Sequence, residues 1–195
     1  KKMPVQKAYY LQQAEERFNR QLAYAKAKKY RNPEEDTKTS NPDFAALFDV
    51  ELGNGIMQED VERVRADMHD ALNNFFDDKS FIEYLQSGKL LMSQRQLTYY
   101  FDRFTIRGTP DLVILFPNKA PHIFDWKVHT FGTYTYDEQL ISYAIALFKV
   151  AKTKPHHDFP KELAEYKLED YQLTEYQLLH KDRIRRDYTI TSEEI

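Results

Sequence analysis

Two aspartates and a lysine stand at the ends of two neighbouring predicted strands. Asp111 opens the apolar run in TPDLVILF, while Asp125 and Lys127 belong to HIFDWKV. Side chains at positions i and i+2 of a strand share one face, so we expect Asp125 and Lys127 to project together and Trp126 to point away. Two carboxylates can hold Mg²⁺, which typically takes only one or two protein carboxylates beside substrate oxygens. An ammonium beside them can orient an attacking water and offset developing charge.

These groups fit the hydrolysis of a phosphodiester. That reaction needs charge neutralisation on the phosphate, an activated water and a stabilised leaving oxygen, all of which divalent cations can supply. Asp125 lies in the apolar run IFDWKV, where a carboxylate is costly to bury unless it is paired or metal-bound. Two plainer alternatives exist. Asp111, which follows Pro110, could be only a turn residue. In an unrelated α/β domain with chance motifs, Asp125 could be only an ion-pair partner of Lys127.

The segments that must position these residues change in type along the chain. Helical periodicity and good helix formers predict helices over residues 5–29, 58–76, 80–88 and 136–152. Residues rich in β-branched and aromatic types predict strands over 97–106, 109–116, 122–128 and 171–180. This order predicts an α/β fold, with a mixed central β-sheet flanked by helices and a helical N-terminal region.

Composition limits the classes of function. The formal net charge of −3 excludes a uniformly basic nucleic-acid binder, so contact with phosphates must come from a local patch or bound cations. The absence of cysteine excludes a disulfide framework, a thiolate zinc site, an iron–sulfur cluster and a cysteine nucleophile. No stretch approaches the roughly 20 apolar residues of a membrane span, and no signal-peptide core is present. We therefore expect a cytoplasmic, intracellular protein with no membrane partner.

The ordered motifs resemble those of the PD-(D/E)XK nuclease superfamily, specifically its RecB-like branch. In that branch a Gly-x-x-Asp strand start precedes an Asp/Glu-x-Lys strand and a helix carrying Gln-x-x-x-Tyr. The chain has GTPD ending at Asp111, DWK ending at Lys127 and QLISY ending at Tyr143. The match covers roughly residues 57 to 150, about half of the chain. It implies a restriction-endonuclease-like core.

The resemblance also implies a domain plan. The whole chain, 1–195, would be one nuclease domain, with an N-terminal helical extension and loop over 1–48 and the PD-(D/E)XK core over 57–180. The chain begins Lys-Lys and has its first methionine at Met3. We therefore expect it to be part of a longer protein.

In a metal-dependent deoxyribonuclease of this type, each motif residue has an implied role. Catalysis would fall to Asp111, Asp125 and Lys127, and substrate positioning to Gln139 and Tyr143, which share one helix face. A histidine on an upstream helix often binds the metal in this family, although a histidine on a helix is otherwise commonly a surface residue. The implied ligands of Mg²⁺ or Mn²⁺ are Asp111, Asp125, the backbone carbonyl of Trp126, and His69.

The implied setting is DNA repair, recombination or defence against foreign DNA, on single- or double-stranded DNA, often beside a helicase-like motor. Endonuclease and exonuclease action both stay open, as does RNA as a substrate. The alternative is a catalytically inactive nucleic-acid-binding or interaction module with the same fold. It is favoured by Gln94 and Gln96, which stand where the branch usually carries a glutamate.

Basic side chains that could follow a nucleic-acid strand occur in two groups, although a charge run is usually a solvated face. The first group is scattered and comprises Arg95, Arg103, Arg107 and Lys149. The second is dense and comprises Lys181, Arg183, Arg185 and Arg186.

Overall fold

The computed structural model of the 195-residue chain describes residues 6–32, 34, 41–128, 137–179 and 185–191. Its internal contacts separate two compact units, residues 1–76 and residues 77–195. The expected single nuclease domain with a core over 57–180 stays a prediction.

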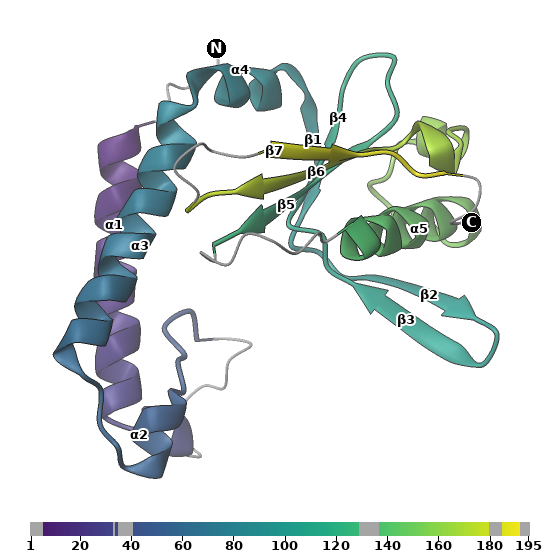
Figure 1. The fold of residues 1–195 in the computed structure, drawn as a ribbon. Coiled ribbons are helices and arrows are strands. Elements are labelled where there is room, and N and C mark those ends of the chain that lie inside the picture. The colour runs from purple at the N-terminus through teal and green to yellow at the C-terminus, as the bar shows by residue number, and fades with distance from the viewer. Residues whose placement is uncertain (1–5, 33, 35–40, 129–136, 180–184, 192–195) are drawn as a thin grey trace. The chain divides into compact units, whose positions relative to one another are not determined.

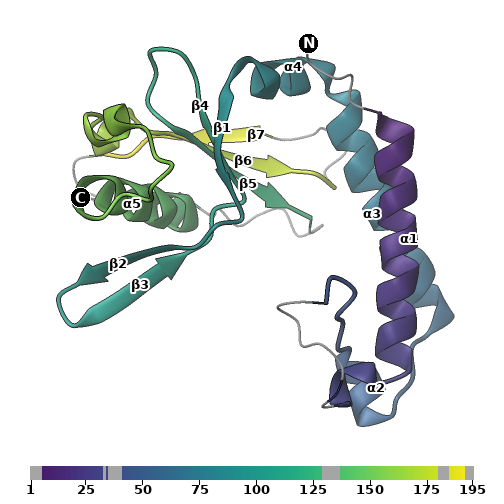
Figure 2. The ribbon, with the colours of Figure 1, turned by 180° about the vertical axis from the view of Figure 1, so that it is seen from behind.

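The first unit is helical, as predicted. It contains α1 (Lys7–Lys26), the short 3₁₀ turn η1 (Lys29–Arg31), α2 (Phe48–Leu52) and most of α3 (Gln58–Asp77). The long helices α1 and α3 lie side by side and run antiparallel (Figures 1 and 2). Near one end Tyr10 stacks on Phe76 with ring centroids 5.4 Å apart, and further along Arg65 Nε donates to Glu15 at 2.7 Å.

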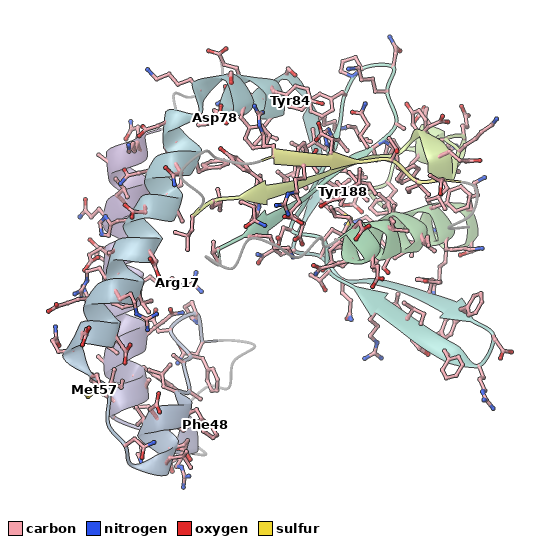
Figure 3. All side chains as sticks on the ribbon, in the orientation of Figure 1. Arg17, Phe48, Met57, Asp78, Tyr84 and Tyr188 are labelled. Carbon is pink, nitrogen blue, oxygen red and sulfur yellow. The ribbon has the colours of Figure 1, made fainter. Side chains whose placement is uncertain are left out.

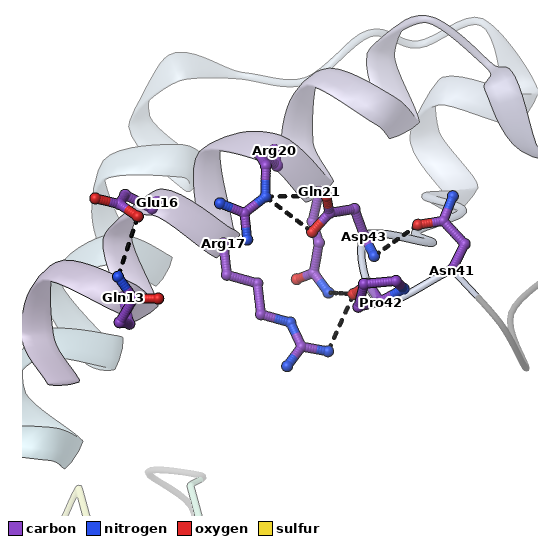
Figure 4. A network of polar contacts seen from close by, with 8 residues as sticks. All are labelled: Gln13, Glu16, Arg17, Arg20, Gln21, Asn41, Pro42 and Asp43. Carbon is purple, nitrogen blue, oxygen red and sulfur yellow. Dashed lines mark hydrogen bonds and ion pairs between the residues drawn. The ribbon is translucent and has the colours of Figure 1, made fainter.

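Polar contacts fasten the segment before α2 to α1 (Figure 4). Arg17 and Gln21 both donate to the Pro42 carbonyl, at 3.0 and 3.2 Å. Arg20 Nε lies 3.1 and 2.9 Å from the two carboxylate oxygens of Asp43. These side chains stand on successive turns of one helix face, so the helix holds an otherwise irregular segment.

The second unit is built on a five-stranded sheet with the order β1-β4-β5-β6-β7 (Figure 1). Its strands β5 and β6 are parallel and its other neighbours are antiparallel, which makes it the mixed sheet that the sequence predicts. The parallel pair follows from α5, because a parallel return needs a crossover connection. The strands are β1 (Lys89–Ser93), β4 (Leu112–Leu115), β5 (His122–Lys127), β6 (Gln172–Gln177) and β7 (Arg185–Tyr188).

Helices cover both faces of this sheet. On one face lies α5 (Asp137–Thr153), which buries six of its residues and packs on β5 and β6. On the other face lies α4 (Lys79–Ser87), where Phe81 packs edge-on against Phe124 and Tyr176. The 3₁₀ turns η2 (Lys161–Ala164) and η3 (Leu168–Asp170) connect α5 to β6. No helix in the described part of the chain combines the length and hydrophobicity needed to cross a bilayer.

A separate two-stranded hairpin, β2 (Leu97–Phe101) and β3 (Phe104–Gly108), extends away from the main sheet (Figures 1 and 2). The prediction of a single strand over residues 97–106 is therefore wrong. Phe101 pairs with Phe104, so the turn is only two residues long, and Asp102 takes a left-handed φ of 50°. Aspartate tolerates that conformation better than most residues, so no glycine or proline marks the turn.

Candidate active site

The site begins where β4 and β5 part. Their pairing ends at Leu112 opposite Phe124. Beyond this point the Trp126 N–H donates to the side chain of Asp111, with 2.9 Å between N and Oδ2, in place of a backbone carbonyl of β4. The N–H and C=O of one residue in a strand point to the same edge, and those of the next residue to the other edge. The Lys127 carbonyl accordingly accepts from Leu178 N at 2.8 Å, on the β6 side. The Trp126 carbonyl therefore points to the Asp111 side.

The backbone around Asp111 is fixed by the turn that follows β1. Gln94 N lies 3.1 Å from both the Pro110 and the Asp111 carbonyls, and Ser93 Oγ donates to the latter at 3.0 Å. Gln94 adopts a left-handed φ of 44° and is exposed. In the structure this residue thus acts through its backbone, by holding the Asp111 segment in place.

Asp125 and Lys127 meet on one face of β5, as the alternation of side chains predicts. Asp125 Oδ2 and Lys127 Nζ are 2.5 Å apart, and their side chains are only 4% and 11% exposed. The Trp126 ring lies on the opposite face, with its centroid 6.0 Å from those of Phe81 and Tyr176. Because the pair is almost fully buried, little water screens the attraction between its two charges.

The surroundings of Asp125 make it a poor place for an isolated negative charge. Burial raises the pKa of the Asp125 carboxyl, Lys127 opposes that rise, and the carboxylates of Asp111 and Glu175 add to it. Within the described residues, buried Oδ2 makes no directed hydrogen bond beyond its ion pair with Lys127. A carboxylate that is buried and incompletely bonded is one that a bound cation would stabilise.

Gln139 and Tyr143 extend this cluster from α5. Lys127 Nζ donates to Gln139 Oε1 at 2.6 Å, and Gln139 Nε2 donates to the Tyr143 hydroxyl at 2.7 Å. The predicted stacking of the two side chains one turn apart is confirmed. Burial raises the pKa of the Tyr143 hydroxyl, which therefore stays protonated at neutral pH. The hydroxyl can then donate a hydrogen bond while it accepts one from Gln139.

Gly108, at the start of the first motif, contacts the last motif. A Cβ at this position would lie 3.0 Å from Tyr143 Cδ1 and 3.3 Å from Cε1. The glycine therefore gives the tyrosine ring room to pack against the backbone of β3. The three motifs, separate in the sequence, form one connected cluster in the second unit.

Glu175 is a site residue that none of the sequence motifs includes. It is the parallel register partner of Asp125 on β6 and is fully buried. Gln177 Nε2 donates to its Oε1 at 2.5 Å, and Arg186 Nη1 lies 3.5 Å from the same oxygen. The signal was available, because Glu175 is the one acidic residue in YQLTEYQLLH and shares a strand face with Tyr171 and Leu173. Its position became visible only with the register between β5 and β6.

His69 belongs to the first unit. It lies on α3, where its Nε2 is 3.0 Å from Glu15 Oε2. Its predicted role as a metal ligand stays a prediction. Across the described residues, no three histidine or acidic side chains come together as a metal-binding group.

The remaining donors still suit a magnesium-like ion. They are the carboxylates of Asp111 and Asp125 and the Trp126 carbonyl, all oxygen atoms at one end of β5. Mg²⁺ prefers oxygen ligands and usually keeps several waters or substrate oxygens in its shell. A site with few protein ligands is therefore compatible with this metal.

The basic candidates fall into different surroundings. Arg95 is held by both carboxylate oxygens of Asp158 at 2.8 Å. Arg185 lies over the Phe81 ring, 5.2 Å from its centroid. Lys181 and Arg183 lie outside the described residues. Exposed positions are occupied by Arg103, Arg107 and Lys149.

A pocket of about 690 Å³ lies on the other face of the sheet, beside α4. Tyr84 and Tyr188, both labelled in Figure 3, contribute to its lining. In its wall His122 Nε2 contacts Thr174 Oγ1 at 2.7 Å, and Thr174 Oγ1 donates to Asp187 at 2.5 Å. None of the predicted catalytic side chains lines this pocket.

Comparison with protein-family models gave no match, and neither did a search of the curated proteins.

Proposed function

We propose that the protein is a divalent-metal-dependent nuclease that hydrolyses DNA phosphodiester bonds. One observation carries the proposal: the three motifs form a single chain of contacts. Lys127 bridges Asp125 and Gln139, and Gln139 reaches Tyr143. The Asp125–Lys127 and Gln139–Tyr143 contacts follow from local spacing. The proposal therefore rests on the contact between Lys127 and Gln139, which joins two motifs on different elements beside a buried carboxylate.

In this proposal each residue has a defined task. Asp111, Asp125 and the Trp126 carbonyl hold Mg²⁺ or Mn²⁺, which when bound neutralises phosphate charge and activates water. Lys127, whose ammonium is held in position by its contacts with Asp125 and Gln139, orients the attacking water and offsets charge on the phosphate. Tyr143 offers its hydroxyl to a substrate oxygen. His69 is the candidate for a further ligand.

The proposed substrate is DNA, single- or double-stranded. The proposed setting is repair, recombination or defence against foreign DNA, with a helicase-like motor as a partner.

The second candidate function is a catalytically inactive module that binds nucleic acid. It is favoured by the lack, among the described residues, of a third metal-binding side chain beside Asp111 and Asp125. It is disfavoured by the burial of the Asp125–Lys127 pair, because burying charge is costly and a module without catalysis has no need of it.

Cleavage of end-labelled linear DNA and of circular DNA, each single- and double-stranded, tests the proposal. Wild type is compared with Lys127→Ala, in Mg²⁺, Mn²⁺ or EDTA. The matched control is Lys152→Ala, which removes an exposed lysine from the same helix that carries Gln139. We expect metal-dependent cleavage by wild type and by the control, and a loss of about 100-fold or more in Lys127→Ala.

The circular substrates separate endonuclease from exonuclease action. DNA binding without cleavage, by a protein whose circular dichroism shows it to be folded, would favour the inactive module. Cleavage by Lys127→Ala at the wild-type rate would contradict the proposed mechanism.

A further inference from the structure

The β2–β3 hairpin exposes large aromatic side chains to solvent. Tyr100 is 78% exposed, Phe101 65% and Phe104 55%. Phe101 and Phe104 flank the two-residue turn, and Tyr100 directly precedes Phe101. Buried aromatic groups stabilise a fold, whereas these contribute little to the core and leave most of their surface in water.

The two faces of the hairpin differ in what they contact. Directly paired residues share a face. The face of Leu97 and Tyr99 packs toward the core, because Leu97 is fully buried and Tyr99 packs against the core cluster. The opposite face carries Tyr100 and Arg107, both exposed. Tyr100 therefore presents aromatic surface on the outward face, whereas the Phe101–Phe104 pair continues the face of Leu97 and Tyr99 to the tip of the hairpin, where both rings are exposed.

The charge of the hairpin differs in sign from that of the whole chain. Residues 97–108 contain two arginines, Arg103 and Arg107, and one acidic residue, Asp102, whereas the chain carries −3 overall. Arg103 lies over the Phe104 ring, 5.4 Å from its centroid. Within the described residues neither arginine forms a salt bridge. Both cations are thus available to a phosphate.

The base of the hairpin is attached to the candidate active site. β2 and β3 pack on α5, the helix that carries Gln139 and Tyr143. Gly108, the last residue of β3, is the residue against which the Tyr143 ring lies. Only Thr109 and Pro110 separate β3 from Asp111. A nucleic-acid strand bound along the hairpin would therefore lead directly to the proposed catalytic residues.

We propose that the β2–β3 hairpin is an arm that binds single-stranded DNA and feeds it to the candidate active site, an inference that rests on the proposed nuclease function. Aromatic rings stack on unpaired bases of any sequence, and arginines beside them neutralise phosphates. In a duplex the faces of the bases are already stacked on each other. The exposed rings therefore favour a single strand over a duplex.

Binding is measured by fluorescence anisotropy in EDTA, with a labelled oligo(dT) strand and with a labelled blunt duplex. The aromatic variant is Tyr100→Ala/Phe101→Ala/Phe104→Ala. The control variant, Phe48→Ala/Leu52→Ala, removes exposed apolar side chains of α2, which are 75% and 60% exposed (Figure 3 labels Phe48). We expect the aromatic variant to bind oligo(dT) at least about tenfold more weakly than wild type, and the control to match wild type.

The contribution of the two hairpin arginines is measured separately, through the salt dependence of binding. In Arg103→Ala/Arg107→Ala, the slope of log affinity for oligo(dT) against log salt concentration should become shallower by about 1.4, roughly 0.7 for each phosphate that is no longer neutralised. All substituted side chains are exposed, so each variant should keep the wild-type melting temperature.

Unchanged affinity of the aromatic variant for oligo(dT), or an equal loss in the α2 control, would overturn the proposal. An equal loss for oligo(dT) and duplex would also overturn it, because the rings would then not be reading unpaired bases. Cleavage is scored separately with wild type in Mn²⁺. Binding that depends on the hairpin, without cleavage, would contradict only the proposed nuclease function. Cleavage without such binding would contradict only the proposed role of the hairpin.

Discussion

At the scale of single residues, the Asp125–Lys127 pair should be strongly coupled. Removing one partner of a buried ion pair leaves the other charge uncompensated, whereas replacing both can be nearly neutral. We expect Asp125→Asn and Lys127→Met each to lower the free energy of unfolding by about 3 kcal/mol, and the double variant to recover much of that loss. Urea unfolding of the four proteins gives the coupling free energy.

The exposed pair Asp60–Arg63 on α3 is the control for this cycle. Its atoms are 2.6 Å apart, but the side chains are 55% and 65% exposed. Its coupling should stay below about 1 kcal/mol. Additive effects of the two substitutions at Asp125 and Lys127 would show that the pair is not isolated from solvent as described.

His122 predicts how stability depends on pH. Burial lowers the pKa of His122 from 6.5 to about 4, against the charge of Asp187, which raises it. Between these two pH values His122 is protonated in the unfolded chain but neutral in the folded chain. The free energy of unfolding therefore falls as the pH drops from about 6.5 to about 4. The loss due to this residue should be roughly 2 to 3 kcal/mol.

The measurement is the unfolding free energy of wild type and His122→Gln across that range. The variant should lose less stability on acidification, while His157→Gln, which removes an exposed histidine, should follow wild type. Parallel curves for wild type and His122→Gln would contradict the assignment.

The residues that the sequence predicted were those with local signals. Alternation along a strand was enough to place Asp125 and Lys127 on one face, and helical spacing was enough to join Gln139 to Tyr143. Glu175 was not predictable in this way, because its neighbour Asp125 lies on another strand and the parallel register is a property of the assembled sheet.

At the scale of secondary-structure elements, two glycines should respond differently to alanine. A Cβ on Gly88, between α4 and β1, would lie 2.2 Å from Ile114 Cγ2 and 2.9 Å from Phe116 Cε1. Overpacking of this kind costs about 1 to 3 kcal/mol. A Cβ on Gly108 would meet only the Tyr143 ring, at 3.0 Å. We expect Gly88→Ala to lose more stability in urea, and Gly108→Ala to lose mainly cleavage. The reverse order would contradict these contacts.

The long helices were predictable, whereas two of the short strands were not. The helices α1, α3 and α5 follow from periodicity sustained over several turns. β1 and β7 have five and four residues and were not predicted. Their short sequences KLLMS and RRDY carry little pattern of their own, and they become strands by pairing with β4 and β6.

At the scale of the whole molecule, the main core lies within one unit. The hydrophobic cluster runs from Met92 to Ile190 and, among the described residues, includes none from the first unit. We therefore expect residues 77–195 alone to fold and to melt cooperatively. A shorter fragment, 79–195, would lack Asp78, which caps α4 by accepting from Phe81 N and also accepts from the Tyr176 hydroxyl.

Thermal melting followed by circular dichroism compares the two fragments. The shorter one should be less stable by about 1 to 2 kcal/mol, the usual value of an N-cap. A fragment 77–195 without a cooperative transition would show that the second unit needs the first. Its cleavage activity also tests His69, because the fragment lacks that residue.

The central claim is that the oxygen ligands at the end of β5 support metal-dependent hydrolysis of DNA. Its most direct test is cleavage of single-stranded DNA in Mn²⁺ by wild type and by Asp111→Asn. The asparagine can still accept the Trp126 N–H through its amide oxygen, so the fold should survive while the negative charge is lost. The proposed function predicts cleavage by wild type and a loss of about 100-fold or more in the variant. Equal rates for the two proteins, or no metal-dependent cleavage by either, would contradict it.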